Sequence, residues 1–411
     1  MVTNLKKSLG FSRAGLEVKI ESFFWEIYMP KGLSSALFDE SQVTLGGSIN
    51  AVRNLLPDSN LLRTAFGAIA LRSMSNAADT PLWMRQEGIR LYSAALEQMS
   101  KELASSSRKH NALAILGAAR IFTFYEALFG YDLKCHATQQ LSWLTHQAGD
   151  LAIVLSKDPS FYATGPAHRL FVDGRMQYAL YAIKTRQKCV LANSAWMCDP
   201  WTHHKKTPKD LLVDILFEFG SIYAEIDSRI LSANLETKAK SQAYLEICMK
   251  MVIKNLSLWN ERFRDDVCIF EKDWESPKNL PVKEITAAHV MTLYWAICIL
   301  AHDANRTIFG GGPTGLEIHP RDCCQGIIRC IPKFLHSSTG TFRQHLIPFP
   351  LMTAMSYLIA TETDGLAEET KYVLSISQAP ELASVFHFMA SLKGSSYIEM
   401  LQARVNDPAI S

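Results

Sequence analysis

The sequence reads SWLTHQ at residues 142–147, TGPAHRLF at 164–171 and AWMCDPW at 195–201, and these pieces mark the segment that decides the fold. A basic stretch, KTRQKC at residues 184–189, lies between the second and third pieces. Apolar residues recur in this segment at three- and four-residue steps, the spacing of one face of an α-helix. The segment therefore predicts helices separated by short breaks.

A long helix is predicted from Gly165-Pro166 to about Leu191, because proline is favoured in the first turn of a helix. Gly174 lies inside this helix and lowers its propensity by about 1 kcal/mol relative to alanine. We therefore expect another helix to pack closely against Gly174. The apolar stripe to which it belongs contains Leu170, Gly174, Tyr178 and Tyr181.

The same periodicity extends outward in both directions and predicts an all-α protein, an irregular array of about a dozen or more helices around a continuous core. No convincing strand alternation and no repeat of fixed period occurs, so a regular solenoid is not expected. Further helices are expected at residues 21–28, 61–74, 82–103, 112–128, 136–155, 209–231, 237–263, 285–308, 322–335, 350–361 and 367–375, with two short ones after Pro380.

The chain is expected to contain a short tail and one large helical domain. Residues 1–20 carry four basic side chains and few large apolar groups, which predicts a basic flexible tail. Residues 21–411 form the helical domain, with a candidate internal linker at 265–281, where the sequence is largely polar and contains two prolines. Three glycines followed by Pro313 predict a flexible connector, because no lysine follows them as a phosphate-binding loop requires.

Composition narrows the class of protein. Hydrophobic residues make up 48% of the 411, and the net charge is only +2. Such a chain can bury a large core, and its charge gives no reason to expect the surface to bind nucleic acid or membrane. The longest apolar run, residues 290–301, is about half of what a membrane-spanning helix needs, so we expect a buried helix there. Nine scattered cysteines, with no Cys-x-x-Cys pair, favour reduced thiols in an intracellular protein.

No pattern of catalytic or metal-binding residues occurs in the sequence. His203-His204 with Cys198 and Asp199 lacks a second ligand pair at a coordinating interval, so a polar loop is expected and no metal is predicted. No cofactor-binding motif occurs either. The basic residues of the long helix are interpreted as a solvated face, and contact with an anion or an acidic partner is the alternative; they are Arg169, Arg175, Lys184, Arg186 and Lys188.

Several stretches, taken in order, are similar to one known family. They are ESFFW at residues 21–25, RLYSAAL at 90–96, residues 143–201, LYWA at 293–296 and FPLMTA at 349–354. Over about residues 21–395 the chain resembles the fungal-specific transcription factor domain. That domain is the helical regulatory region that normally follows a Zn2Cys6 DNA-binding cluster, and such proteins often accompany gene clusters for specialised metabolites.

The departure from the family concerns DNA binding. A Zn2Cys6 cluster needs six closely spaced cysteines, and this sequence has no cysteine before Cys135. The resemblance therefore implies a nuclear regulator or co-regulator of transcription that binds a partner transcription factor or a small hydrophobic ligand, and not DNA through a zinc cluster. The alternative is a cytoplasmic, cofactor-free cyclase or isomerase (a pericyclase) of specialised metabolism. No membrane association is expected, and a homodimer is left open.

Six amphipathic side chains are the candidates for a ligand pocket: Trp143, His146, Tyr178, Trp196, Trp201 and Trp295. Tryptophan and tyrosine combine apolar contact with one placed hydrogen bond. If the protein is an enzyme, His146 is the candidate acid or base, because its unperturbed pKa lies near neutrality. The alternative is that these rings fill the core.

Overall fold

The computed structural model describes residues 13–28, 47–75, 82–104, 112–130, 135–268, 282–311, 314–361, 367–379 and 382–393. Sixteen α-helices and a few short 3-10 turns make up nearly all of these residues, and no strand occurs among them. The prediction of an all-α, multi-helix array is therefore confirmed. Residues 1–12 of the expected tail and 269–281 of the candidate linker lie outside the described ranges.

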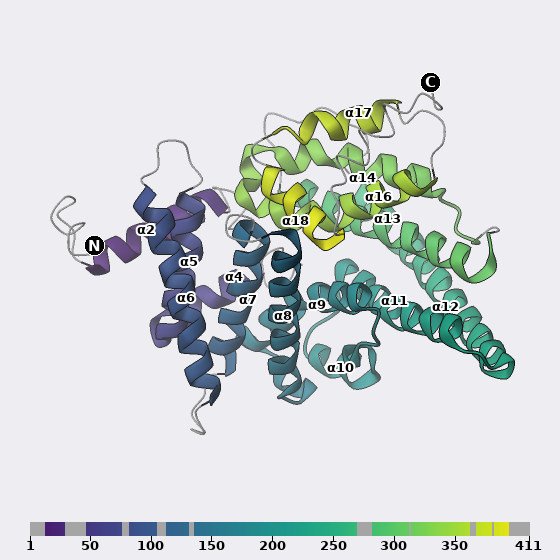
Figure 1. Ribbon diagram of the computed structural model, residues 1–411, viewed down its shortest axis with the longest axis horizontal. Coiled ribbons are helices and arrows are strands. Elements are labelled where there is room, and N and C mark those ends of the chain that lie inside the picture. The colour runs from purple at the N-terminus through teal and green to yellow at the C-terminus, as the bar shows by residue number, and fades with distance from the viewer. Residues whose placement is uncertain are drawn as a thin grey trace.

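The N-terminal half is built on α5, which packs against α2, α6 and α7, while α7 packs in turn on α8 (Figure 1). Helix α2 includes residues 13–20, which belong to the segment expected to be a flexible tail. The helices are α2 (Arg13–Tyr28), α4 (Gly47–Leu55), α5 (Asn60–Met74), α6 (Leu82–Ala104), α7 (Ala112–Phe129) and α8 (His136–Leu155).

In the middle of the chain α9 packs on α11, and α11 forms a long antiparallel pair with α12, which extends to one side of the molecule in Figure 1. The start of α11 is held by a reciprocal cap: the Thr207 hydroxyl accepts from the Asp210 amide, and the Asp210 carboxylate accepts from the Thr207 amide. The helices are α9 (Gly165–Thr185), α10 (Ser194–Cys198), α11 (Pro208–Leu231) and α12 (Leu235–Val267).

The C-terminal helices gather around α13, and α18 returns to pack on α7 and α8 (Figure 1). One cluster of buried apolar residues runs from Phe24 to Met389, so both halves share a continuous core, as the sequence predicts. The helices are α13 (Val282–Phe309), α14 (Pro320–Leu335), α15 (Arg343–Leu346), α16 (Pro348–Thr361), α17 (Ala367–Ile376) and α18 (Ala383–Lys393).

The long helix α9 ends earlier than its apolar pattern predicts. Its last residue is Thr185, and Arg186 adopts the left-handed conformation with φ 53°, which stops the helix. The Arg186 guanidinium forms two hydrogen bonds of 2.6 Å with the Asp227 carboxylate of α11. This tertiary contact holds an arginine in a backbone conformation that is uncommon for residues other than glycine, so the prediction of a helix to Leu191 is wrong.

Two helices are long and apolar enough to cross a membrane by length and composition, Ala112–Phe129 in α7 and Glu284–Phe309 in α13. In each of them 83% of the apolar window is buried inside the protein. Packing within the core therefore accounts for their hydrophobicity, which includes the apolar run at 290–301. This run is buried along nearly its whole length, as expected.

Candidate ligand-binding site

An apolar cavity of about 550 Å³ lies between helices of the N-terminal half and helices of the C-terminal half. Small-molecule sites are typically cavities of roughly 300–1,000 Å³ with apolar walls and a few polar groups. This cavity, called the junction cavity below, fits that description. Its walls come from α7, α8, α9, α13, α15, α16 and α18, and their apolar side chains include Phe124, Trp143, Met176, Leu180, Ile183, Leu300, Phe349, Met352, Phe388 and Leu392.

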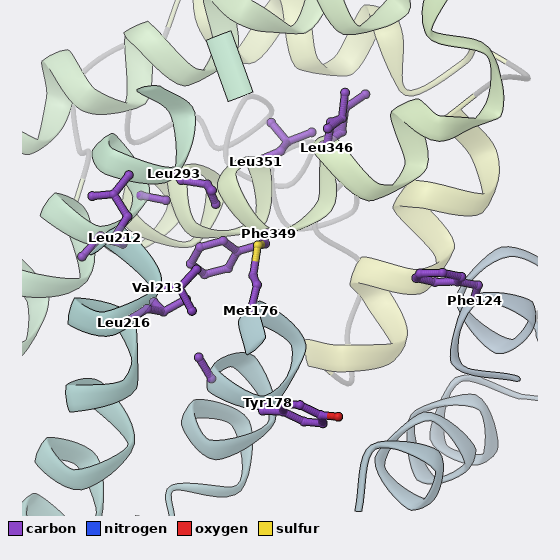
Figure 2. Close-up of a cluster of buried hydrophobic side chains, with 14 of the residues drawn as sticks. Phe124, Met176, Tyr178, Leu212, Val213, Leu216, Leu293, Leu346, Phe349 and Leu351 are labelled. Carbon is purple, nitrogen blue, oxygen red and sulfur yellow. The ribbon is translucent and has the colours of Figure 1, made fainter. Parts of the chain in front are cut away.

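The two longest walls arise from helical spacing. On α16, Phe349, Met352 and Ala360 recur at steps that place them on one face, and on α9, Met176 and Leu180 are separated by one turn. Figure 2 shows Met176 rising from α9 toward Phe349 on the opposite wall. The same periodicity that predicts these helices therefore also builds the cavity, once the two helices face each other.

One end of the junction cavity carries two lysines. Lys184 on α9 donates from Nζ to the backbone carbonyl of Leu392 on α18, and Lys393 follows directly in sequence. Lys393 is exposed, so this end, called the lysine mouth below, faces solvent. Partial burial lowers the pKa of both amines, because desolvation disfavours the charged form.

The other end reaches into the core and meets a smaller cavity of about 50 Å³. There His345 Nε2, His289 Nδ1 and the Tyr28 hydroxyl are buried without a hydrogen-bond partner among the described residues. Burial lowers the pKa of His345 to about 4 and also lowers that of His289. Both imidazoles are therefore neutral near pH 7, and each offers one donor and one acceptor. Buried polar atoms of this kind bind an ordered water or a polar group of a ligand.

The carboxylate on the cavity wall does not neutralise the lysine mouth. Asp303 on α13 lines the junction cavity, and its Oδ1 lies 2.6 Å from Nη2 of Arg306, one turn along the same helix. No carboxylate of the described residues pairs with Lys184, whose hydrogen bond is to a backbone carbonyl. Lys184 therefore contributes a positive charge at the mouth that no described carboxylate offsets.

A second cavity, of about 740 Å³, lies between α12, α13, α14 and residues 315–318. It is more polar, and its basic and acidic side chains balance: Arg264, Arg329 and Lys333 against Glu261, Glu317 and Asp322. Trp295 lines it while packing on Gly326, where an added Cβ would come within 2.8 Å of the indole ring. Its lining is more polar than that of the junction cavity, so it suits a hydrophobic ligand less well.

His146, the candidate acid or base, lies on α8 among other polar groups of the N-terminal half. Its Nε2 is 3.0 Å from the Tyr92 hydroxyl, which donates to Glu126 Oε1 at 2.6 Å. His146 is not among the lining residues of the junction cavity or of the more polar cavity. Its neighbours thus place it in a hydrogen-bonded cluster that joins α6, α7 and α8.

Tyr178 on α9 is hydrogen-bonded to both partners of a buried ion pair between α7 and α8. Arg120 Nη1 lies 2.6 Å from Asp150 Oδ2, and both side chains are almost completely inaccessible to solvent. The Tyr178 hydroxyl accepts from Arg120 at 2.6 Å and donates to Asp150 at 3.2 Å. The guanidinium lies directly over Gly174, which explains the glycine: a Cβ at this position would collide with Arg120. The neighbour that packs closely against Gly174 is thus the Arg120 side chain of α7.

Trp196 and Trp201 pack over α9 and do not reach the junction cavity. The rings of Trp196 and Trp201 lie 5.5 and 5.8 Å from that of Phe171. The Arg175 guanidinium lies 4.4 Å from the Trp201 ring and forms an ion pair with Asp214. The interpretation of the α9 basic residues as a solvated face is therefore wrong for Arg175, which is buried under a tryptophan and neutralised by a carboxylate.

The six candidate pocket residues are thus distributed over several places. Trp143 lines the junction cavity and Trp295 lines the more polar one, while the other four pack elsewhere. The sequence did not point to His345 or Lys393, because a single histidine or lysine in a helical pattern carries no signal of what it faces. For Lys184 the sequence offered a weak indication, because it lies in the basic stretch at residues 184–189 for which contact with an anion was the alternative.

Fold and site together define a class: an all-α protein with an apolar, lysine-bordered cavity at the junction of its two halves. No group of three or more histidine, cysteine or acidic side chains that could hold a metal ion occurs within the described ranges. No family model, no curated protein and no solved structure matches this chain. The resemblance to the fungal-specific transcription factor domain therefore stays a prediction from the stretches quoted from the sequence.

Proposed function

We propose that this protein is a ligand-responsive regulator or co-regulator of transcription that acts through a partner transcription factor. The resemblance of residues 21–395 to a regulatory domain supports the class of protein, and the net charge of only +2 gives no reason to expect these residues to bind DNA themselves. The observation that carries the proposal is the junction cavity, an apolar space of about 550 Å³ with polar groups at its two ends. We expect the protein in the nucleus, regulating genes of specialised metabolism.

The position of the junction cavity provides a route from ligand binding to regulation. A ligand there contacts α7, α8 and α9 on one side and α13, α16 and α18 on the other. It therefore stabilises the arrangement of the two halves that it fits, in proportion to its preference for that arrangement. A partner protein that binds the same arrangement gains affinity by the same coupling free energy.

Deletion of the gene, followed by transcript and metabolite profiling, tests this proposal. Complementation uses the wild type, Ala127→Phe, which fills the junction cavity from α7, and Ala137→Phe, a matched change at an exposed position of α8. We expect deletion to abolish a set of transcripts. Wild type and Ala137→Phe restore them, whereas Ala127→Phe does not.

Two outcomes would contradict the proposal, the first for regulation of transcription and the second for the role of the junction cavity. Normal transcripts with an accumulating intermediate would instead support the enzyme alternative, a cofactor-free cyclase or isomerase. Full restoration by Ala127→Phe, with the folded variant present at wild-type abundance, would show that the junction cavity has no part in the function.

A further inference from the structure

The two ends of the junction cavity differ in charge, and this difference specifies the ligand. The inner end presents the neutral imidazoles of His289 and His345. Two cations also line it, but each lies beside a carboxylate that offsets its charge: Arg120 beside Asp150 and Lys209 beside Asp173. The mouth presents the ammonium groups of Lys184 and Lys393, with no described carboxylate paired to Lys184. A ligand that matches both ends has an apolar body and a single negative charge on the side of the mouth.

The ammonium of Lys184 has donors to spare. An ammonium group has three N–H donors, and Lys184 uses one of them on the Leu392 carbonyl. The Gln140 side-chain amide donates to the same carbonyl at 2.9 Å, so the end of α18 keeps a hydrogen bond when Lys184 turns toward a ligand. Lys184 is thus positioned by α18 and remains able to donate to an anion.

The length of the apolar body follows from α9. Gln177 lines both the junction cavity and the small inner cavity, and Lys184 lies at the mouth. These two residues are seven positions apart on one helix, which corresponds to about 10 Å at 1.5 Å per residue. The side chains between them that line the cavity are the apolar Leu180 and Ile183.

We propose that the junction cavity binds an amphipathic carboxylic acid, with its hydrocarbon body between α9 and α16 and its carboxylate at Lys184 and Lys393. This inference rests on the proposed ligand-binding function and narrows it to one class of ligand. Charge-assisted hydrogen bonds between ammonium and carboxylate are about twice as strong as neutral ones. An amine of the same length would place a third positive charge at the mouth, where like charges repel.

Calorimetric titration of the full chain with decanoate, 1-decanol and decylamine tests the inference, because the three probes share a hydrocarbon tail and differ in head group. At neutral pH we expect decanoate to bind about tenfold more tightly than 1-decanol, the ratio that a charge-assisted hydrogen bond provides. Decylamine should bind most weakly of the three.

Variants of Lys184 test whether this residue causes the preference for decanoate over 1-decanol. Lys184→Gln should reduce decanoate affinity about tenfold and leave 1-decanol affinity unchanged. Lys184→Arg, which keeps the charge, should preserve the preference for decanoate. Lys250→Gln, a matched change at an exposed position of α12, should alter neither affinity. Circular dichroism and thermal unfolding of each variant check that the overall helix content and stability are retained.

The outcomes separate this inference from the proposed function. If decanoate and 1-decanol bind equally, or if Lys184→Gln weakens both alike, the carboxylate assignment is wrong while ligand binding in the cavity stands. If none of the three probes binds the folded wild-type chain, the proposed ligand-binding function fails together with it.

Discussion

Arg120→Met tests the buried ion pair that joins α7, α8 and α9. Arg120 and Asp150 are 2% and 0% exposed, so the variant leaves a carboxylate buried without its cation. Removing one partner of a buried pair typically lowers the free energy of unfolding by about 3–5 kcal/mol. For 411 residues that unfold cooperatively, this corresponds to a fall in Tm of about 4–6 °C at the typical unfolding entropy per residue.

The loss of unfolding free energy in Arg120→Met should depend on pH, because a proton taken up by the Asp150 carboxyl removes the buried charge. In the wild type, burial raises the pKa of Asp150 to about 6, although Arg120 and Tyr178 lower it. The folded state thus holds a proton that the unfolded state releases, so this group's contribution to stability falls as the pH rises from about 4 to about 6. Without Arg120 the folded pKa of Asp150 rises further, and the deficit of the variant grows as the pH rises above about 6.

Urea unfolding of wild type and Arg120→Met near pH 5 and near pH 8 measures the effect. We expect the full loss near pH 8, and only the roughly 1–2 kcal/mol of the broken hydrogen bonds near pH 5. The double variant Arg120→Met/Asp150→Asn removes the titrating carboxyl. It should be more stable than the single variant near pH 8 and about equally stable near pH 5. Equal losses for the single variant at both pH values would refute the assignment of a charged, buried pair.

Three further changes test the packing around α8, α9 and α11. Gly174→Ala should lower the free energy of unfolding by about 1–3 kcal/mol in thermal or urea unfolding, because its Cβ collides with Arg120; an unchanged midpoint would contradict that contact. Thr207→Ala removes one half of the α11 cap and should lower it by about 1 kcal/mol, whereas Thr207→Ser should not. His146→Ala should lower it by about 1 kcal/mol through the lost hydrogen bond to the Tyr92 hydroxyl. Loss of conversion of a pathway intermediate by His146→Ala with no change in Tm would instead support the enzyme alternative.

Apolar periodicity alone determined the all-α class and most helix positions. The pattern predicts helices at residues 82–103 and 209–231, and the structure has Leu82–Ala104 and Pro208–Leu231. Prolines, glycines and caps act within a few residues of where they occur, so helix boundaries are largely readable from the sequence. The apolar run at 290–301 is likewise long enough to identify a buried helix, whatever its neighbours are.

Tertiary structure decided what each side chain faces. Arg175 and Lys184 are both basic residues of α9, yet the first is buried under Trp201 and the second lines the cavity mouth. Periodicity places a residue on a face of its helix and carries no information about which distant helix covers that face. Tyr178 is a core residue because it faces Arg120 of α7 and Asp150 of α8. Trp143 lines a cavity because α18 returns onto the N-terminal helices beside it.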